Sequence, residues 1–272
     1  MGSVKSQSQV PFVGIVALCK NEIDALRVIT NQLNETLEQE DFKSHVVYVD
    51  GNSTDGSFEY LMNSRCHVIS QTAPGIAEAL RVGLESIIEM GCSHIVMFQP
   101  DGNCDPTLVP SLVAPMINNS VDLVIGSRYF NTSRSLDDTA LTFVGNSLFR
   151  FMYKLRFPSS NLRDPIVGFR AFPVRLLRDL DLIDETEYRW LETLLNATLS
   201  FDPLMTTRAL ASDLNVLEVD APEGQRIGGI PKRTAWRWGV GYTIQLWLDQ
   251  PIRLFTGKKI FTKRRIEGIR CL

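Results

Sequence analysis

The sequence predicts an α/β protein with a mostly parallel central sheet covered by helices on both faces. Three observations predict this fold class. Short apolar runs alternate with helical patterns, each run is almost continuously apolar, and each ends in a polar or glycine-containing turn. Strands that are apolar at every position are buried on both faces, as in parallel sheets whose crossover connections are helices.

The predicted elements follow one another in a regular order. We expect strands at residues 12–18, 46–49, 66–70, 95–98, 121–125 and 215–219. We expect helices at residues 23–38, 57–63, 76–88, 108–117, 143–155, 174–180 and 188–199. The helix at 57–63 begins inside a Ser/Thr/Asp cluster, which is typical of helix N-caps, and Pro74-Gly75 breaks the chain before the next helix.

Composition limits the classes of function. The net charge of −3 gives no overall attraction to nucleic acid. Five scattered cysteines, with no CxxC pair, argue against a disulfide framework or a zinc site and favour a reducing cytoplasm. Residues 1–9 lack the apolar core of a signal peptide, so we expect a frayed tail there.

Polar clusters follow several of the predicted strands. Glu22, residues 50–55, residues 101–105 and Arg128 each come directly after an apolar run. Ligands of parallel sheets bind beyond the carboxyl ends of the strands, where all four clusters would lie. Core packing needs no polar residues at these places, so the clusters predict a functional site.

One of these clusters has the pattern of a metal site. Asp101, Asn103 and Asp105 carry oxygen atoms at alternate positions after the strand at 95–98. Hard divalent cations bind such oxygens and keep open positions for phosphate. This predicts a site for Mg²⁺ or Mn²⁺, while the alternative is a solvated turn, which Asp, Gly, Asn and Pro also favour.

The second half of the chain contains three further segments of interest. Residues 131–139 form a polar loop, and residues 223–233 form a glycine-rich basic loop that is either a lid over an anion or a solvated linker. Residues 236–248 are rich in aromatic and apolar side chains, but the stretch is shorter than the roughly 20 apolar residues of a spanning helix. With the basic tail that follows, this segment either lies on an anionic membrane surface or packs against the body.

Six motifs in this order resemble the family 2 glycosyltransferases, and most closely the branch of dolichyl-phosphate mannose synthase and bacterial polyprenyl-phosphate relatives. The motifs are Lys20-Asn21-Glu22, Asp50-Gly-Asn-Ser-Thr-Asp55, Gly75 with Ala79 and Gly83, Asp101-Gly-Asn103, Gly126-Ser-Arg-Tyr129 and Asp164-Pro-Ile-Val-Gly-Phe-Arg170. The resemblance covers roughly residues 11 to 233 and implies the GT-A fold, which binds nucleotide-diphospho-sugars.

The resemblance also implies roles for individual residues. Glu22 and Asp50 would bind the nucleoside of the donor, with Asp55 shaping the loop and Gly75 at the start of the following helix. Asp101, with Asn103 and Asp105, would hold Mg²⁺ or Mn²⁺ on the diphosphate. Arg128 would face a donor or acceptor phosphate, and Arg226 and Lys232 would close over the diphosphate.

Three departures from the family pattern affect these expectations. Gly51 stands where the family has a second Asp, and Asn103 replaces the second Asp of the metal motif. Near Gly145-Asn146, Thr142 and Phe143 stand where relatives carry an arginine for a lipid phosphate. We also expect no long membrane-spanning extension of the kind that many relatives carry.

The expected reaction is an inverting transfer of a sugar from a GDP- or UDP-sugar to a polyprenyl or dolichyl phosphate. The alternative acceptor is a hydroxyl group, which needs a general base, and Asp164 is the carboxylate we nominate. Two other classes stay open: a nucleotidyltransferase, although the first loop has no glycine, and a non-catalytic nucleotide-sugar-binding protein.

The predicted organisation has three parts: a disordered tail at 1–10, a glycosyltransferase domain at 11–233 and an aromatic and basic segment at 234–272. Within the domain, residues 11–130 would form the nucleotide-sugar half and residues 131–233 the acceptor half. We expect no nucleic acid partner and a cytoplasmic protein, and contact with the inner membrane surface through 234–272 stays open. Homo-oligomerisation stays open.

Overall fold

The computed structural model of the chain describes residues 10–117, 121–130, 135–136, 139–183, 185–228 and 235–262. Four predictions therefore lie outside the described residues: the tail at 1–9, Lys232, the boundary at residue 233 and the basic tail from residue 263. Most of the polar loop at 131–139 lies outside them as well.

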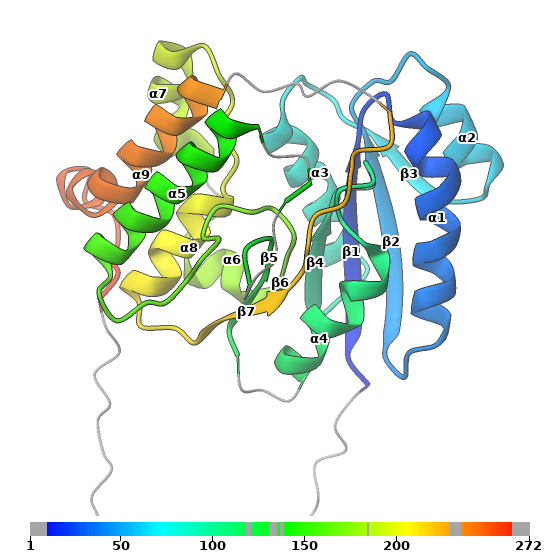
Figure 1. The fold of residues 1–272 in the computed structure, drawn as a ribbon, viewed down its shortest axis with the longest axis horizontal. Helices are drawn as coiled ribbons and strands as arrows, with labels where there is room; N and C mark the ends of the chain where they lie inside the picture. Colours follow the sequence, from blue (N-terminus) through cyan, green and yellow to red (C-terminus); the bar gives the residue numbers. More distant parts are fainter. Residues whose placement is uncertain are drawn as a thin grey trace, which may run out of the picture.

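A seven-stranded sheet in the order β3-β2-β1-β4-β6-β5-β7 forms the centre of the protein (Figure 1). Every pair of neighbours is parallel except those that involve β6, which runs antiparallel to both β4 and β5. The strands are β1 (Phe12–Cys19), β2 (Lys43–Asp50), β3 (His67–Ser70), β4 (His94–Phe98), β5 (Leu123–Ser127), β6 (Arg170–Pro173) and β7 (Val216–Asp220). The predicted mostly parallel sheet is confirmed.

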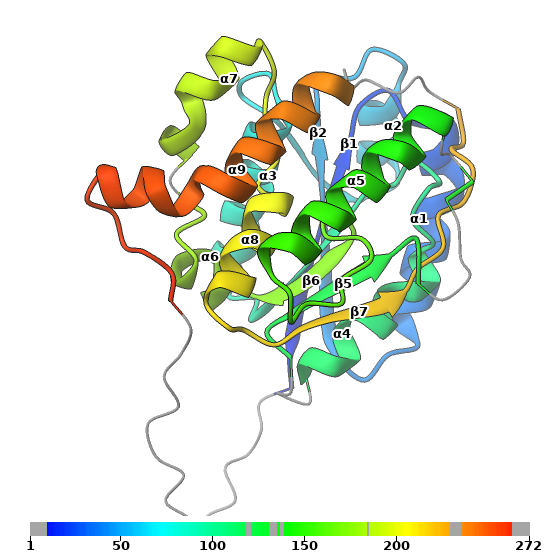
Figure 2. The ribbon, with the colours of Figure 1, turned by 60° about the vertical axis from the view of Figure 1, so that its left-hand side comes forward.

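Helices cover both faces of the sheet, as predicted (Figures 1 and 2). The helices are α1 (Ile23–Glu38), α2 (Ser57–Asn63), α3 (Ile76–Glu89), α4 (Val109–Ile117), α5 (Ala140–Arg156), α6 (Arg175–Asp179), α7 (Arg189–Leu195), α8 (Asp202–Ala211) and α9 (Ala235–Phe255), with short 3-10 turns η1 (Pro106–Leu108) and η2 (Glu185–Tyr188). Apolar side chains of α1, α2 and α4 form one core with the sheet, and those of α3 and α5 to α9 form the other. The sheet therefore separates two apolar cores, one on each of its faces.

The structure differs from the prediction mainly in the second half of the chain. Strand β6 and helix α8 were not predicted, and the helix expected at 188–199 ends at Leu195. It ends there because Asn196 adopts the left-handed conformation, with φ at 46°. Helix α8 is hard to recognise because it is buried nearly all round, including Thr206, Thr207 and Arg208.

A buried ionic network ties α9 to α8 and η2. Arg208 donates from Nη2 to Glu187 at 2.6 Å and to Asp249 at 2.7 Å. Arg253 donates to the same Glu187 at 2.9 Å, and both arginine side chains are fully buried. The ring of Phe261 lies against both guanidinium groups, with centroid distances of 5.4 and 4.8 Å. The segment after α9 is therefore held to the body by charge as well as by packing.

Helix α9 has 21 residues and includes Asp249, Arg253 and Pro251. Among the described residues, no helix has both the length and the apolar character needed to cross a membrane.

Close packing of α3 on the sheet depends on Gly83. A Cβ at this position would lie 2.5 Å from Cγ1 of Val16 and 2.9 Å from Cγ2 of Val49, both in the sheet. We expect Gly83→Ala to lower the free energy of unfolding by about 1–3 kcal/mol, because neither strand can yield easily. Chemical denaturation measures the change.

Gly145→Ala in α5 is the matched control, because nothing lies within 4 Å of a Cβ there. Alanine favours a helix interior over glycine, so this variant should be unchanged or more stable, by up to about 1 kcal/mol. Equal losses of stability in the two variants would contradict the packing argument.

Candidate active site

The loops after β1 and β2 are fastened to each other by Asp55. Its Oδ2 accepts a hydrogen bond from the backbone N–H of Ile23 at 3.0 Å, and its Oδ1 accepts from the N–H and hydroxyl of Ser57. Ser57 in turn receives the N–H of Glu22 on its hydroxyl oxygen at 3.0 Å. Partial burial acts to raise the pKa of Asp55, but the hydrogen bonds from Ser57 and Ile23 outweigh it and lower the pKa.

Asp50 is the buried carboxylate beneath the same two loops. It is 1% exposed at the carboxyl end of β2, and its carboxylate accepts the N–H of Ser53 at 3.0 Å and the hydroxyl of Ser53 at 2.5 Å. Ser53 also accepts the N–H of Asn21 from the neighbouring loop at 2.9 Å. The parallel pairing of β1 with β2, which places Cys19 opposite Asp50, brings these two loops together.

The centre of the site is an ion-paired trio from three distant parts of the chain. Arg226 donates from Nη1 to Glu22 at 3.0 Å and from Nη2 to Asp101 at 2.6 Å. Glu22 and Asp101 are each 5% exposed, and the Arg226 side chain is 19% exposed. The structure thus brings together three of the predicted site residues, with the guanidinium group of Arg226 between two nearly buried carboxylates.

Backbone contacts fix the segment that carries Arg226. The N–H of Gly224 donates to the carbonyl of Asn103, and the N–H of Ile227 donates to the carbonyl of Asp101, both at 2.9 Å. Gly102 adopts φ of 91°, and a Cβ there would lie 2.6 Å from the Ile227 side chain. Figure 1 shows this segment leaving β7 and running past β4 toward β1 and α1. It covers the loop of the predicted metal motif.

A second ion pair lies at the carboxyl end of β5. Arg128 donates from Nε and Nη2 to the two carboxylate oxygens of Asp164 at 2.7 and 2.9 Å. The backbone N–H of Arg128 also donates to Asp164, which is 1% exposed. Burial acts to lower the pKa of Arg128, but the charge of Asp164 and its hydrogen bonds raise the pKa well above the usual value. Arg128 therefore stays charged and has a fixed orientation.

Two glutamates complete this second cluster, and the sequence analysis missed both. Glu218 on β7 accepts the backbone N–H groups of Arg163 and Asp164, which positions Asp164. Burial raises the pKa of Glu218. Glu223 lies 3.7 Å from Nη1 of Arg128 and accepts a hydrogen bond from Ser135. A glutamate inside an otherwise apolar strand was the available signal for Glu218.

Three other predicted site residues are not part of these clusters. Asp105 is exposed, and its Oδ1 caps η1 by accepting the N–H and hydroxyl of Thr107 at 2.9 and 2.7 Å. Gly75 begins α3 with φ of 123°, and a Cβ there would meet Thr198 at 3.2 Å. Lys232 lies outside the described residues.

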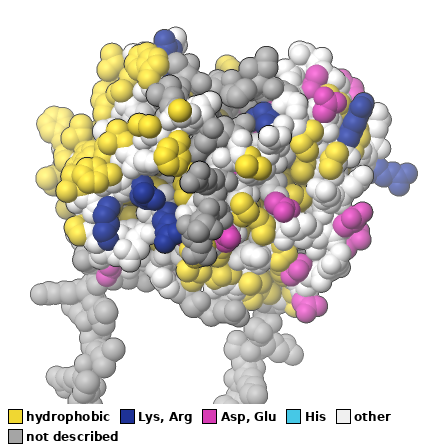
Figure 3. All heavy atoms as spheres, viewed as in Figure 1, with side chains coloured by type: hydrophobic (Ala, Val, Ile, Leu, Met, Phe, Trp, Pro, Cys, Tyr) yellow, Lys and Arg dark blue, Asp and Glu magenta, His cyan; other side chains and the backbone are white. Residues whose placement is uncertain are grey.

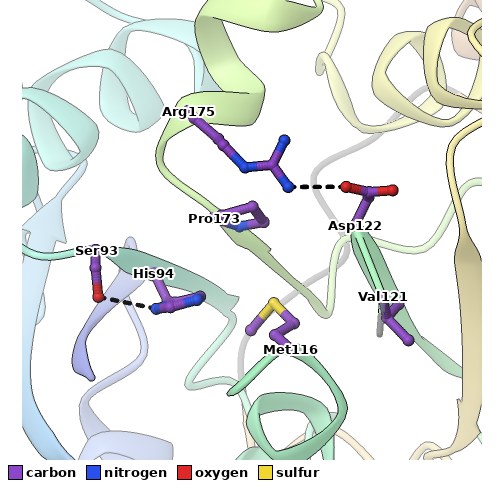
Figure 4. A pocket seen from close by; sticks show the side chains of 7 residues that line it. All are labelled: Ser93, His94, Met116, Val121, Asp122, Pro173 and Arg175. Atoms are coloured by element: carbon purple, nitrogen blue, oxygen red, sulfur yellow. Dashed lines mark hydrogen bonds and ion pairs between the residues drawn. The ribbon is translucent and has the colours of Figure 1, made fainter. Parts of the chain in front are cut away.

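One pocket lies away from these clusters. This cavity of about 300 Å³ is at the opposite edge of the sheet, where β4 and β5 begin, and none of the predicted site residues lines it (Figure 4). Its lining residues are Ser93, His94, Met116, Val121, Asp122, Pro173 and Arg175. The guanidinium of Arg175 is paired with Asp122 at 2.8 Å, so its charge is already matched.

The donor set around Asp101 fits a divalent cation in its chemistry. Glu22 and Asp101 share one cationic group, and the nearly buried Asn103 follows on the same loop. Hard cations prefer such carboxylate and amide oxygens and complete their shell with water or phosphate. Among the described residues, no three His, Cys, Asp or Glu side chains are grouped as a ready metal cage. The described side chains alone would thus supply only part of the ligand shell of a metal ion.

Comparison with known sequences found a matching family profile and a matching relative. The profile described as "Glycosyl transferase family 2" matches residues 15–181. The chain is also 29% identical over 174 residues to "Glycosyltransferase AglJ" of Haloferax volcanii. This match covers 60% of the present chain and 54% of that protein, so the chain spans about half the length of this relative.

Solved structures share the fold at low sequence identity. A mannosyl-3-phosphoglycerate synthase from Rubrobacter xylanophilus superposes with a TM-score of 0.61 at 12% identity, covering 96% of this chain and 79% of that one. A glucosyl-3-phosphoglycerate synthase from Mycobacterium tuberculosis, in complex with Mn²⁺, UDP-glucose and phosphoglyceric acid, superposes with a TM-score of 0.59 at 17% identity. That match covers 88% of this chain and 79% of that one.

The hydrogen bonds of Asp55 give a stability prediction. Asp55→Ala should lower the free energy of unfolding at pH 7 by about 1 kcal/mol, since it removes the acceptor for the first turn of α2. Because the folded pKa is lowered, the stabilisation is present above the ordinary value of 3.8 and is lost as the pH falls through the folded pKa.

Denaturation of both proteins at pH 7, 5 and 3.5 measures this difference. The gap between wild type and variant should be constant from pH 7 to 5 and should shrink at the lowest pH. A gap that widens on acidification would contradict the assignment, and Glu59→Ala is the control, because its carboxylate follows in the first turn of the same helix.

Proposed function

Because the chain belongs to glycosyl transferase family 2, we propose that it is an inverting glycosyltransferase that acts on a nucleotide-diphospho-sugar. The observation that carries the proposal is the trio of Glu22, Asp101 and Arg226 at the carboxyl edge of the sheet, whose carboxylates suit a divalent cation and whose guanidinium suits a diphosphate. The proposed acceptor is a polyprenyl or dolichyl phosphate, as in the dolichyl-phosphate mannose synthase branch.

The donor is proposed to bind across the loops after β1, β2 and β4. Asp50 and Glu22 suit the hydroxyl and ring donors of a nucleoside, because both are carboxylates held at the floor of the site. A UDP-sugar and a GDP-sugar both meet this description. UDP-glucose with Mn²⁺ in the glucosyl-3-phosphoglycerate synthase supports a metal-assisted donor of this kind.

The chemistry requires stabilisation of a leaving group. An acceptor oxygen forms a bond to the anomeric carbon while the bond from that carbon to the diphosphate oxygen breaks, and the electron pair leaves with the nucleoside diphosphate. Mg²⁺ or Mn²⁺, held by Asp101 and Asn103, would supply positive charge to that diphosphate. Arg226, which donates to Asp101 in the structure, would donate hydrogen bonds to the same phosphates once it leaves its carboxylate partners.

The arrangement of Asp164 favours a phosphate acceptor over a hydroxyl. A hydroxyl acceptor needs a general base, but both oxygens of Asp164 are held by Arg128 and the backbone. An ionised phosphate needs no base.

The metal assignment is tested first with Asp101→Ala. This variant should lose sugar transfer by at least about a thousandfold, because the leaving diphosphate loses its cation.

A panel of UDP- and GDP-sugars, scored by thermal shift with and without Mn²⁺, identifies the donor, since a ligand of the folded state raises the melting temperature. Undiminished transfer in EDTA would contradict the metal, and a donor shift without any transfer would favour a binding protein.

Arg226 should compete with the metal for Asp101. We expect Arg226→Met to bind Mn²⁺ alone about tenfold more tightly, because a charge-assisted hydrogen bond is worth about 1.5–3 kcal/mol. The same variant should transfer sugar more slowly. Titration calorimetry with MnCl₂ measures the affinity without any substrate.

Arg81→Met is the control for the loss of one positive charge, because Arg81 pairs with Glu78 and Glu85 of its own helix. It should leave the Mn²⁺ affinity unchanged. An equal affinity for Mn²⁺ in wild type and Arg226→Met would mean that Arg226 and the metal do not share Asp101.

A further inference from the structure

We propose that the exposed apolar face of α5, α7 and α9 docks onto an anionic lipid surface. We call this surface the apolar face. Its exposed side chains are Phe143, Val144, Leu148, Phe151, Leu155, Trp190, Leu194, Trp236, Val240, Leu248, Leu254 and Phe255. Figure 3 shows apolar side chains gathered over these helices on one side of the molecule.

Helix α5 has an unpartnered apolar stripe. Val144, Leu148, Phe151 and Leu155 follow at the spacing i, i+4, i+7 and i+11, which places them on one side of the helix. They are 63%, 54%, 64% and 60% exposed, although buried side chains such as Phe149 and Tyr153 already fill the opposite side. Such a stripe is much more than the single surface leucines that are normal on soluble proteins.

Helix α9 carries a second stripe beside the first. Trp236, Val240 and Leu254 are 64%, 43% and 68% exposed, and Phe255 at the end of the helix is 93% exposed. Helices α5 and α9 contact each other, and Figures 1 and 2 both show them side by side. Trp190 of α7, a helix in contact with α9, adds an exposed indole, a side chain that suits the boundary between lipid and water.

The charges around the apolar face favour an anionic lipid surface. Helix α5 contains no acidic residue, and the one acidic residue of α9, Asp249, is fully buried. Exposed basic side chains border the face at Arg150, Lys154 and Lys259. An amphipathic surface with aromatic residues and basic borders binds in the interfacial plane of membranes with anionic lipids.

The same charges oppose a second copy of this chain as the occupant. A symmetric dimer through the apolar face would bring the basic borders of α5 against each other with no exposed acid on α5 or α9 to match them. Like charges brought together at an interface cost binding free energy. A membrane offers the matching negative charge.

The apolar face is continuous with the second ion-paired cluster of the site. Asn146 of α5 donates to the hydroxyl of Tyr129 at 2.6 Å, and the rings of Phe143 and Tyr129 pack edge to face at 6.5 Å. Tyr129 follows Arg128, whose guanidinium lies 5.2 Å from the tyrosine ring. Docking would therefore hold Arg128 near the lipid headgroups, where a lipid phosphate acceptor lies; this consequence rests on the proposed function.

Vesicle binding tests the docking without any sugar transfer. Full-length protein should float with vesicles of equal parts phosphatidylcholine and phosphatidylglycerol, and less with pure phosphatidylcholine or in high salt. Leu148→Gln with Phe151→Gln should weaken binding about tenfold, because two side chains lose their apolar contact with lipid. Both residues are exposed, so the fold should be kept, and Val144→Gln with Leu155→Gln gives a second, independent pair.

Met62→Gln with Ile88→Gln is the matched control, because these side chains are similarly exposed on α2 and α3, outside the apolar face. It should bind vesicles as wild type does. Equal binding by all variants, or no binding to anionic vesicles, would overturn the proposal. So would a dimer by light scattering that dissociates in Leu148→Gln with Phe151→Gln. The donor thermal shift should persist in every variant, which separates this test from that of the proposed function.

Discussion

The direction of the strands is the constraint on which the site depends. Because β1, β2, β4 and β5 run parallel, their carboxyl ends share one edge, and the loops that follow them meet there. The antiparallel β6 lies between β4 and β5 without disturbing this edge. Residues separated by many positions in sequence, such as Glu22 and Asp101, then become neighbours of one guanidinium group.

Much of this arrangement could be predicted from the sequence, and the reason is physical. Each predicted strand in the first half is an almost continuously apolar run, and helices α1 and α2 were predicted at their observed bounds. Membership of the predicted family is confirmed by the match over residues 15–181. The second half was harder because β6 has only four residues and begins with a buried arginine, Arg170, inside a motif to which no strand was assigned.

The site was predicted in part. Motifs indicated Glu22, Asp50 and Asp101. The contact between Glu22 and Arg226, however, joins residues 204 positions apart in the sequence. Local patterns do not encode such pairings. They also do not distinguish a carboxylate that caps a turn from one that faces a ligand, and Asp105 does the former through Thr107. The roles of all these residues in binding and catalysis stay predictions.

The buried charges beside α9 have a consequence for the stability of the chain when the residues after α9 are removed. Phe261 lies between Arg208 and Arg253, and the carbonyl of Lys259 accepts a hydrogen bond from Nε of Arg253 at 2.6 Å. A hydrogen bond to a charged group is worth about 1.5–3 kcal/mol, which is a large fraction of the stability of a typical domain. The few residues after α9 thus stabilise the helical layer. We expect local unfolding of that layer to begin with the detachment of these residues.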